Sequence, residues 1–101
     1  MVKADYDSRA DALLIQLLGP GLCDGAVEVD RFHCHADTRK GRVASIELLN
    51  PADHLDLLDR AAERLGLDAE ALLATAEAAL AAPDRPVTVE VGDSAASASA
   101  A

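Results

Sequence analysis

Aromatic residues are almost absent from this chain of 101 residues, which has one Phe, one Tyr and no Trp. Aromatic side chains bury the most area per residue, so a core without them depends on aliphatic packing. Half of the chain is hydrophobic, and most of that half is Ala, Leu and Val. A domain of this length buries roughly 65% of its unfolded surface. The composition therefore allows one modest core, which a second subunit would help to complete.

Basic residues are also scarce. The chain has 9 Lys and Arg against 18 Asp and Glu, and its formal net charge is −9. Binding to a phosphate backbone needs clustered Lys and Arg, and the densest group, residues 39–42, has the pattern of a turn. We therefore expect no direct contact with nucleic acid. The acidity suits a solvated surface and a basic protein partner.

Long apolar runs, export signals and cofactor motifs are missing as well. No run approaches the ~20 apolar residues of a membrane helix, and the first residues lack a signal-peptide pattern. The two cysteines, Cys23 and Cys34, are not expected to pair in the cytosol. Residues 19–21 read Gly-Pro-Gly but open no helix, as a phosphate-binding loop would. We expect a cytoplasmic protein without a cofactor and without a membrane contact.

Alternating apolar residues predict the strands. The clearest is residues 42–49, in which Ala44, Ile46 and Leu48 share one face. A helix is an alternative for residues 12–18, because Ala and Leu favour helix, but the short length and the following Gly19 favour a strand. The four predicted strands are residues 2–6, 12–18, 27–36 and 42–49, the third with a bulge near Arg31 and Phe32. Short turns between them indicate an antiparallel meander.

Capping residues predict two helices after this sheet. Asn50 and Pro51 suit the start of a helix over 51–64, and Gly66 suits its end. Asp68 suits the cap of an Ala-rich helix over 69–81. Residues 86–91 alternate and form a fifth strand candidate, which would pair with the edge of the sheet or with another chain.

The expected architecture is thus α+β, with a four-stranded antiparallel meander packed against two C-terminal helices. A fifth strand at the C-terminal end is a further option. We expect a single domain over residues 1–92. Residues 93–101 are small and polar, which predicts a disordered tail.

Two motifs in the first half resemble a small bacterial family, the domain of unknown function number 2283. The first motif is Tyr-Asp, three residues, then Asp-Ala-Leu and a strand; the second is an acidic turn, Gly and a strand ending in Ile-Glu-Ile-Leu. The matching residues are Tyr6, Asp7, Asp11, Ala12, Leu13, Ile15, Leu17, Gly41, Val43, Ile46, Glu47 and Leu49. Leu14 stands where the family usually has Tyr. The resemblance covers roughly residues 2–50.

This resemblance implies a small meander sheet followed by a helix, and it implies no catalytic residues. Some members resemble partners of small toxin-like proteins encoded beside them. The resemblance therefore implies an antitoxin-like role as one form of the expected protein interaction.

Acidic residues at one sheet end form the first candidate site. Asp5, Asp7, Asp11 and Glu47 would converge there if the two motif strands lie together. Paired carboxylates can perform acid–base chemistry, and three can hold a hard metal ion. The alternative is structural, because Asp commonly bonds turn amides. We favour the structural interpretation, and keep binding by Asp7, Asp11 and Glu47 as the rival hypothesis.

The second candidate is His33-Cys34-His35. On a strand, His33 and His35 would point to one face and supply half of a zinc or copper site, with Cys23, Asp37 or a second subunit completing it. Cys34 would then point into the core. Because only one such pair is visible, we expect no tightly bound zinc.

The sequence therefore favours a non-catalytic interaction or accessory protein that binds a protein partner. The alternative is a small enzyme, or a ligand- or metal-binding protein, that uses the acids or the histidines. We also expect a homodimer, because Leu14, Val43 and Leu49 would lie opposite the core face and the Ala-rich helix permits close packing.

Overall fold

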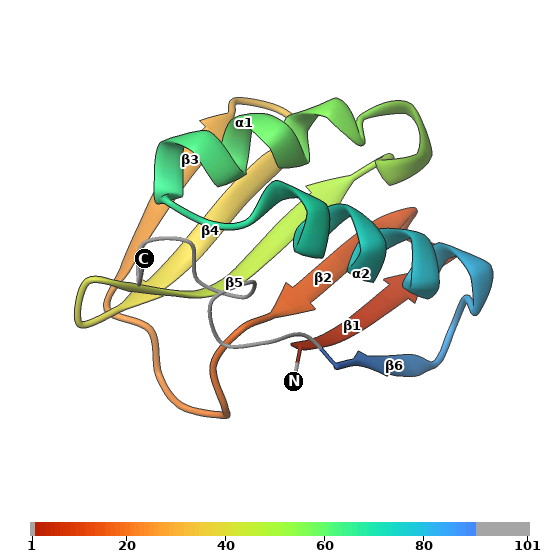
Figure 1. Ribbon diagram of the computed structural model, residues 1–101, viewed down its shortest axis with the longest axis horizontal. Coiled ribbons are helices and arrows are strands. Elements are labelled where there is room, and N and C mark those ends of the chain that lie inside the picture. Colours follow the sequence, from red (N-terminus) through yellow and green to blue (C-terminus); the bar gives the residue numbers. More distant parts are fainter. Residues whose placement is uncertain (1, 91–101) are drawn as a thin grey trace.

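A computed structural model describes residues 2–90 of the chain as one antiparallel sheet with helices packed on it (Figure 1). The strands are β1 (Val2–Asp7), β2 (Ala12–Gln16), β3 (Gly25–Asp30), β4 (Cys34–Arg39), β5 (Arg42–Leu49) and β6 (Pro86–Val89). A 3₁₀ turn, η1 (Pro51–Asp53), leads to α1 (Asp56–Leu65) and α2 (Ala69–Ala81). The predicted α+β class is confirmed.

The strand order corrects the predicted meander. The sheet has six strands in the order β3-β4-β5-β2-β1-β6. A hairpin of β1 and β2 lies beside a three-stranded meander of β3, β4 and β5, and β5 pairs with β2. The loop over residues 17–24 therefore crosses the sheet end. Arg39 holds this loop by donating to the carbonyl oxygens of Gly19, Gly21 and Leu22 at 3.0–3.2 Å.

The third predicted strand, residues 27–36, is in fact two strands joined by a turn. Residues 31–33 form the turn, and β3 and β4 pair on either side of it. The turn has no Gly, Pro or Asn, so its sequence gives no strong turn signal. Asp30 stabilises the turn, because its carboxylate accepts hydrogen bonds from the backbone amides of Phe32 and His33.

The first predicted helix is also divided. The backbone of Asn50 has the left-handed conformation (φ 49°), and its side chain does not cap the helix. Residues 51–53 form a 3₁₀ turn, and α1 begins only at Asp56. Gly66 ends α1 in the left-handed conformation, as predicted. The Asp68 cap of α2 is confirmed, since its carboxylate accepts from the Ala71 amide at 3.1 Å.

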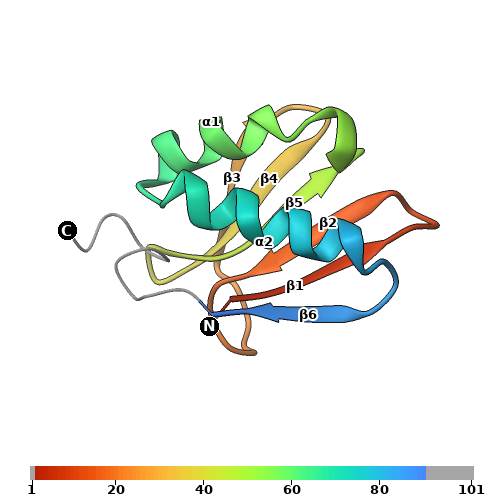
Figure 2. The same cartoon turned by 45° about the vertical axis from the view of Figure 1, so that its right-hand side comes forward.

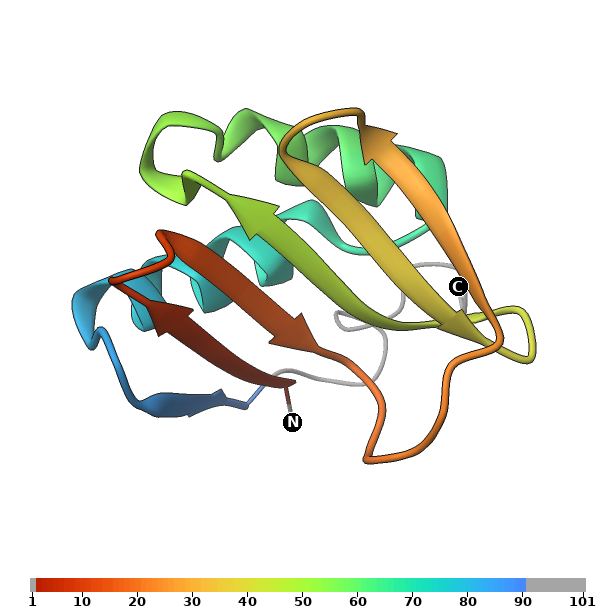
Figure 3. The ribbon, with the colours of Figure 1, turned by 180° about the vertical axis from the view of Figure 1, so that it is seen from behind.

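Both helices cover the same face of the sheet. Helix α1 contacts β3, and α2 contacts β1, β2 and β6 (Figure 1). The core lies between these layers, and its fully buried large side chains include Leu13, Ile15, Ile46, Leu48 and Leu58. The opposite face carries no helix, as the view from behind shows (Figure 3). We call this uncovered side of the strands the open face.

Strand β6 pairs with β1 and extends the sheet at this edge (Figure 2). Of the two predicted pairings, the structure has the one with the edge of the sheet. It is half as long as β5. The predicted tail, residues 93–101, lies outside the described residues. Within residues 2–90, no helix is both long and apolar enough to cross a membrane.

Candidate functional site

One row of side chains crosses the open face from strand to strand. In register, Asp5 of β1 lies opposite Leu14 of β2, and Leu14 lies opposite Glu47 of β5. Glu47 pairs with His35 of β4, and His35 pairs with Glu28 of β3. We call these five residues the acidic row. Neighbouring strands lie ~4.8 Å apart, so carboxylates recur along it at intervals of ~10 Å.

The acidic row is accessible to solvent. Glu47 is 42% exposed and His35 is 46% exposed, and the closest approach of their polar atoms is 3.8 Å. Asp5 and Glu28 are exposed, and Leu14 is half-buried between its acidic neighbours. Glu28 was not among the predicted site residues, because its place beside His35 depends on the β3–β4 pairing that the sequence pattern did not show.

The structure brings three of the four predicted acids to one hollow. A hollow of about 570 Å³ at the hairpin end of the open face is lined by Asp5, Asp7 and Glu47, and also by Asp84. Asp11 is not among its lining residues. Asp84, which was not predicted as a site residue, precedes β6 and accepts hydrogen bonds from the Ser8 amide and hydroxyl at 2.8 and 2.6 Å. These bonds hold the pKa of the Asp84 carboxyl below its usual value.

Asp7 has the turn role that was predicted for it. Its carboxylate accepts hydrogen bonds from the backbone amides of Arg9 and Ala10, at 2.9 and 3.2 Å. One oxygen atom accepts both bonds, and Asp7 also lines the hollow. Asp7 thus stabilises the β1–β2 turn and also adds negative charge to the open face.

Asp11 belongs to a different cluster, which joins the hairpin to the end of β5. It accepts a hydrogen bond from the Tyr6 hydroxyl at 2.6 Å and another from the Asn50 side chain at 2.9 Å. The backbone N–H of Asn50 also donates a hydrogen bond to the backbone carbonyl oxygen of Asp11. Asp11 and Asn50 are both left-handed, which Asp and Asn tolerate better than most residues. This cluster fixes the register of β2 against β5.

The hydrogen bonds of the Asp11 cluster shift the pKa values of two of its members. The Tyr6 hydrogen bond, aided by that of Asn50, lowers the pKa of Asp11. The same hydrogen bond raises the pKa of Tyr6, so its hydroxyl stays protonated at neutral pH. A tyrosine that acts as a nucleophile or base needs the opposite shift.

The two predicted metal ligands lie in different surroundings. His33 is in the turn before β4, where its Nδ1 contacts Asp30 at 3.2 Å and its ring stacks on His54, with centroids 3.9 Å apart. His35 is on β4 and faces Glu47. His33 therefore does not lie on the strand that the prediction required. Over residues 2–90, no three or more His, Cys, Asp or Glu side chains are grouped closely enough to hold a metal ion.

The cysteines are separate and differ in exposure. Cys34 is buried in the core, as the structural interpretation of the His-Cys-His segment had it, and Cys23 is exposed. Burial raises the pKa of the Cys34 thiol to about 11. Cys34 is therefore protonated and apolar in behaviour at neutral pH, unlike a reactive cysteine.

Two of the three strand residues behind the homodimer prediction also lie on the open face. Leu14 and Leu49 alternate with buried neighbours and are half-buried themselves. The prediction was wrong for Val43, which packs against the core, because a register shift between β4 and β5 pairs it with Thr38. The Ala-rich face of α2, in contrast, is used inside the molecule, because Ala71, Ala76 and Ala79 are buried within this chain. The dimer prediction thus depends on the same face as the acidic row.

Comparison with known proteins adds no relative to this description. No family model, no curated protein and no solved structure matches the chain. The resemblance to the domain of unknown function number 2283 stays a prediction, and the fold and the open face are what the structure contributes to function.

Proposed function

We propose that this protein is a small non-catalytic interaction protein whose open face binds a basic protein partner. The observation that carries the proposal is the acidic row, which places Asp5, Glu47 and Glu28 across an uncovered sheet with Leu14 between two of them. Charged side chains of one sign on an exposed surface steer and select a partner of the opposite sign.

The rest of the open face is of mixed charge. Asp7 and Asp37 add two further carboxylates, while Lys3 on β1 adds a cation and the paired Arg39 and Arg42 add two more at the far end of β4 and β5. Half-buried apolar residues, Leu14 and Leu49, lie among these charges. A mixture of charge with modest apolar area is typical of non-obligate protein interfaces. It suits a folded basic partner or a basic segment that lies across the strands.

Among the described residues, five groups have pKa shifts that lead away from neutral pH. Tyr6 and Cys34 have raised pKa values, and both stay protonated at neutral pH. The carboxylates of Asp11, Asp30 and Asp84 have lowered pKa values, because each accepts hydrogen bonds from neighbouring groups. Groups poised to exchange protons near neutral pH would show shifts in the other direction. The antitoxin-like role implied by the resemblance is one form that this binding would take.

A displayed library of random peptides, selected against the intact chain, tests the proposal without a known partner. We expect the enriched peptides to be rich in Lys and Arg. The variant Asp5→Asn/Glu47→Gln should lose this enrichment. The control Glu70→Gln/Glu77→Gln removes two charges from the exposed side of α2 instead, so both variants change the formal net charge from −9 to −7.

The control distinguishes the effect of charges on the open face from the effect of net charge alone. The proposal requires that the α2 variant keep the enrichment of basic peptides. Equal loss in both variants, enrichment of neutral or acidic peptides, or no enrichment would each contradict it.

A further inference from the structure

The chain's single Phe is on the surface. Phe32 is 70% exposed, although aromatic side chains are the largest apolar groups available to this core. The Arg31 guanidinium lies 5.4 Å from the ring centroid, close enough for a cation–π contact. A residue that would contribute most to the core is thus presented to solvent at the tip of the β3–β4 turn.

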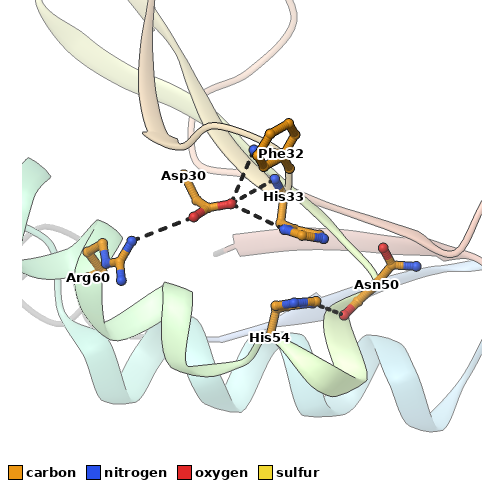
Figure 4. A network of polar contacts seen from close by, with 6 residues as sticks. All are labelled: Asp30, Phe32, His33, Asn50, His54 and Arg60. Carbon is orange, nitrogen blue, oxygen red and sulfur yellow. Dashed lines mark hydrogen bonds and ion pairs between the residues drawn. The ribbon is translucent and has the colours of Figure 1, made fainter.

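The turn that carries Phe32 is firmly held. One carboxylate oxygen of Asp30 accepts from the Phe32 amide at 3.2 Å and from the His33 amide at 3.1 Å, and it contacts the His33 ring at 3.2 Å (Figure 4). The other oxygen lies 3.7 Å from Arg60 of α1. The bond from the Phe32 amide, together with those from His33, keeps the pKa of Asp30 below its usual value.

Residues after β5 support the turn from the other side. The His33 ring stacks on His54 at an interplanar angle of 21°, and His54 in turn contacts the Asn50 carbonyl oxygen at 3.0 Å (Figure 4). The turn is therefore tied to α1 and to the segment that leads into it. A turn whose backbone is held in place before binding loses less conformational entropy when a partner docks.

The Phe32 ring borders the open face. A hollow of about 440 Å³ is lined by Phe32 together with Glu28, His35 and Leu49. Two of these residues, Glu28 and His35, belong to the acidic row. In Figure 4 the ring lies on the side of the turn away from Arg60 and His54. Phe32 and the acidic row thus form one continuous surface.

We infer that Phe32 is the apolar anchor of this surface, and that the partner presents an aliphatic or aromatic side chain next to its Lys or Arg residues. The inference rests on the proposed function and specifies the partner's chemistry. Interface energy concentrates in a few aromatic and Arg residues surrounded by weaker contacts. A second copy of this chain is a poorer occupant, because its acidic row would face Glu28 and Glu47 with charge of the same sign.

A double-mutant cycle tests the anchor. The probes are the peptides enriched on the wild-type chain in the library selection, each also synthesised with its apolar residue replaced by Ser. We expect that replacement to weaken binding to the wild type about tenfold, as for a typical anchor contact. On Phe32→Ala the same replacement should change the affinity less than about threefold, because the coupled partner is gone.

Two further variants control for other effects. Phe32→Leu keeps an apolar side chain and should retain most of the preference for the apolar peptide. Leu22→Ala removes the other large apolar residue that is exposed within residues 2–90; it is 93% exposed and precedes β3, at the end opposite the turn. It should bind both peptides as the wild type does.

The outcomes separate this inference from the proposed function. Basic peptides that bind wild type and Phe32→Ala with equal preference for the apolar residue would overturn the anchor and leave the basic-partner proposal standing. Failure to enrich basic peptides at all would overturn both. Dimerisation of the wild type that Phe32→Ala abolishes would assign the ring to a second copy and also overturn the inference.

Discussion

Single carboxylates in this protein divide into those that hold the fold and those that face solvent. Asp11, Asp30 and Asp84 each accept several hydrogen bonds and have lowered pKa values. Asp5 and Glu47 have exposed positions on the open face instead. Asp7 belongs to both groups, because it accepts hydrogen bonds from two turn amides and also lies on the open face.

The first prediction at this scale concerns acid stability. Because the pKa of Asp11 in the folded state lies below its ordinary value of 3.8, the ionised form stabilises the fold above that pH. The contribution is lost as the pH falls through the folded pKa. Asp11→Asn should therefore be less stable than wild type at pH 7, and the difference should shrink in acid.

Urea unfolding of both proteins between pH 7 and about pH 3 measures this convergence. Asp59→Asn, on the exposed side of α1, is the control. A stability difference for Asp11→Asn that stays constant over the whole range would contradict the assignment.

The second prediction compares Asp7 with Glu47. Asp7→Ala removes an acceptor from two turn amides and should lower the free energy of unfolding by about 1 kcal/mol, the usual value of such a bond. Glu47→Gln should change stability by less than about 0.5 kcal/mol, as exposed substitutions do, but should weaken binding of basic peptides. Thermal melts and peptide affinities of both variants test this comparison. A Glu47→Gln protein that loses stability and keeps binding would make Glu47 a structural residue and remove it from the binding surface.

At the scale of elements, each helix and strand depends on a few local signals. Helix α2 begins at the Asp68 cap and α1 ends at Gly66. The β3–β4 turn depends on Asp30, and the β1–β2 turn depends on Asp7. Where such a signal is explicit in the sequence, as at Asp68, the boundary was predicted.

The third prediction tests the α2 cap. Asp68→Ala removes the acceptor of the Ala71 amide and should lower the free energy of unfolding by about 1 kcal/mol. Asp68→Asn should retain most of the stability, because Asn is an equally good cap. Equal losses in the two variants, measured by urea unfolding, would show that charge rather than capping stabilises this end.

Several features could not be predicted from local sequence. Arg31, Phe32 and His33 carry no turn signal, so the pattern predicted one strand in place of β3 and β4. Asn50 has the composition of a helix cap, but its side chain bonds Asp11, which is 39 residues away in the chain. The pairing of β5 with β2 was also not predictable from local sequence, because it depends on contacts between segments that are distant in the chain. The acidic row follows from that pairing and from the pairing of β3 with β4, which is why Glu28 was not anticipated.

At the scale of the whole molecule, the helices leave one sheet face uncovered, and that face is acidic. The predicted homodimer and the proposed basic partner would use the same surface. Their dependence on salt differs in sign, because screening weakens attraction between opposite charges and also weakens repulsion between like charges.

The fourth prediction uses this difference. If the chain dimerises through the open face, light scattering should show the dimer fraction rising with salt concentration. The affinity for basic peptides should fall over the same range. A dimer whose fraction falls or stays constant with added salt would place the contact elsewhere on the molecule.

Binding at the open face can be observed residue by residue in an amide chemical-shift map of the intact chain, recorded during titration with a synthetic Lys-rich peptide. We expect the largest shifts on the open-face strands, around Asp5, Leu14, Glu47 and His35. A Glu-rich peptide of equal length should cause none of them. Shifts concentrated on α1 and α2, or spread evenly over the surface, would contradict the assignment of the open face as the binding surface.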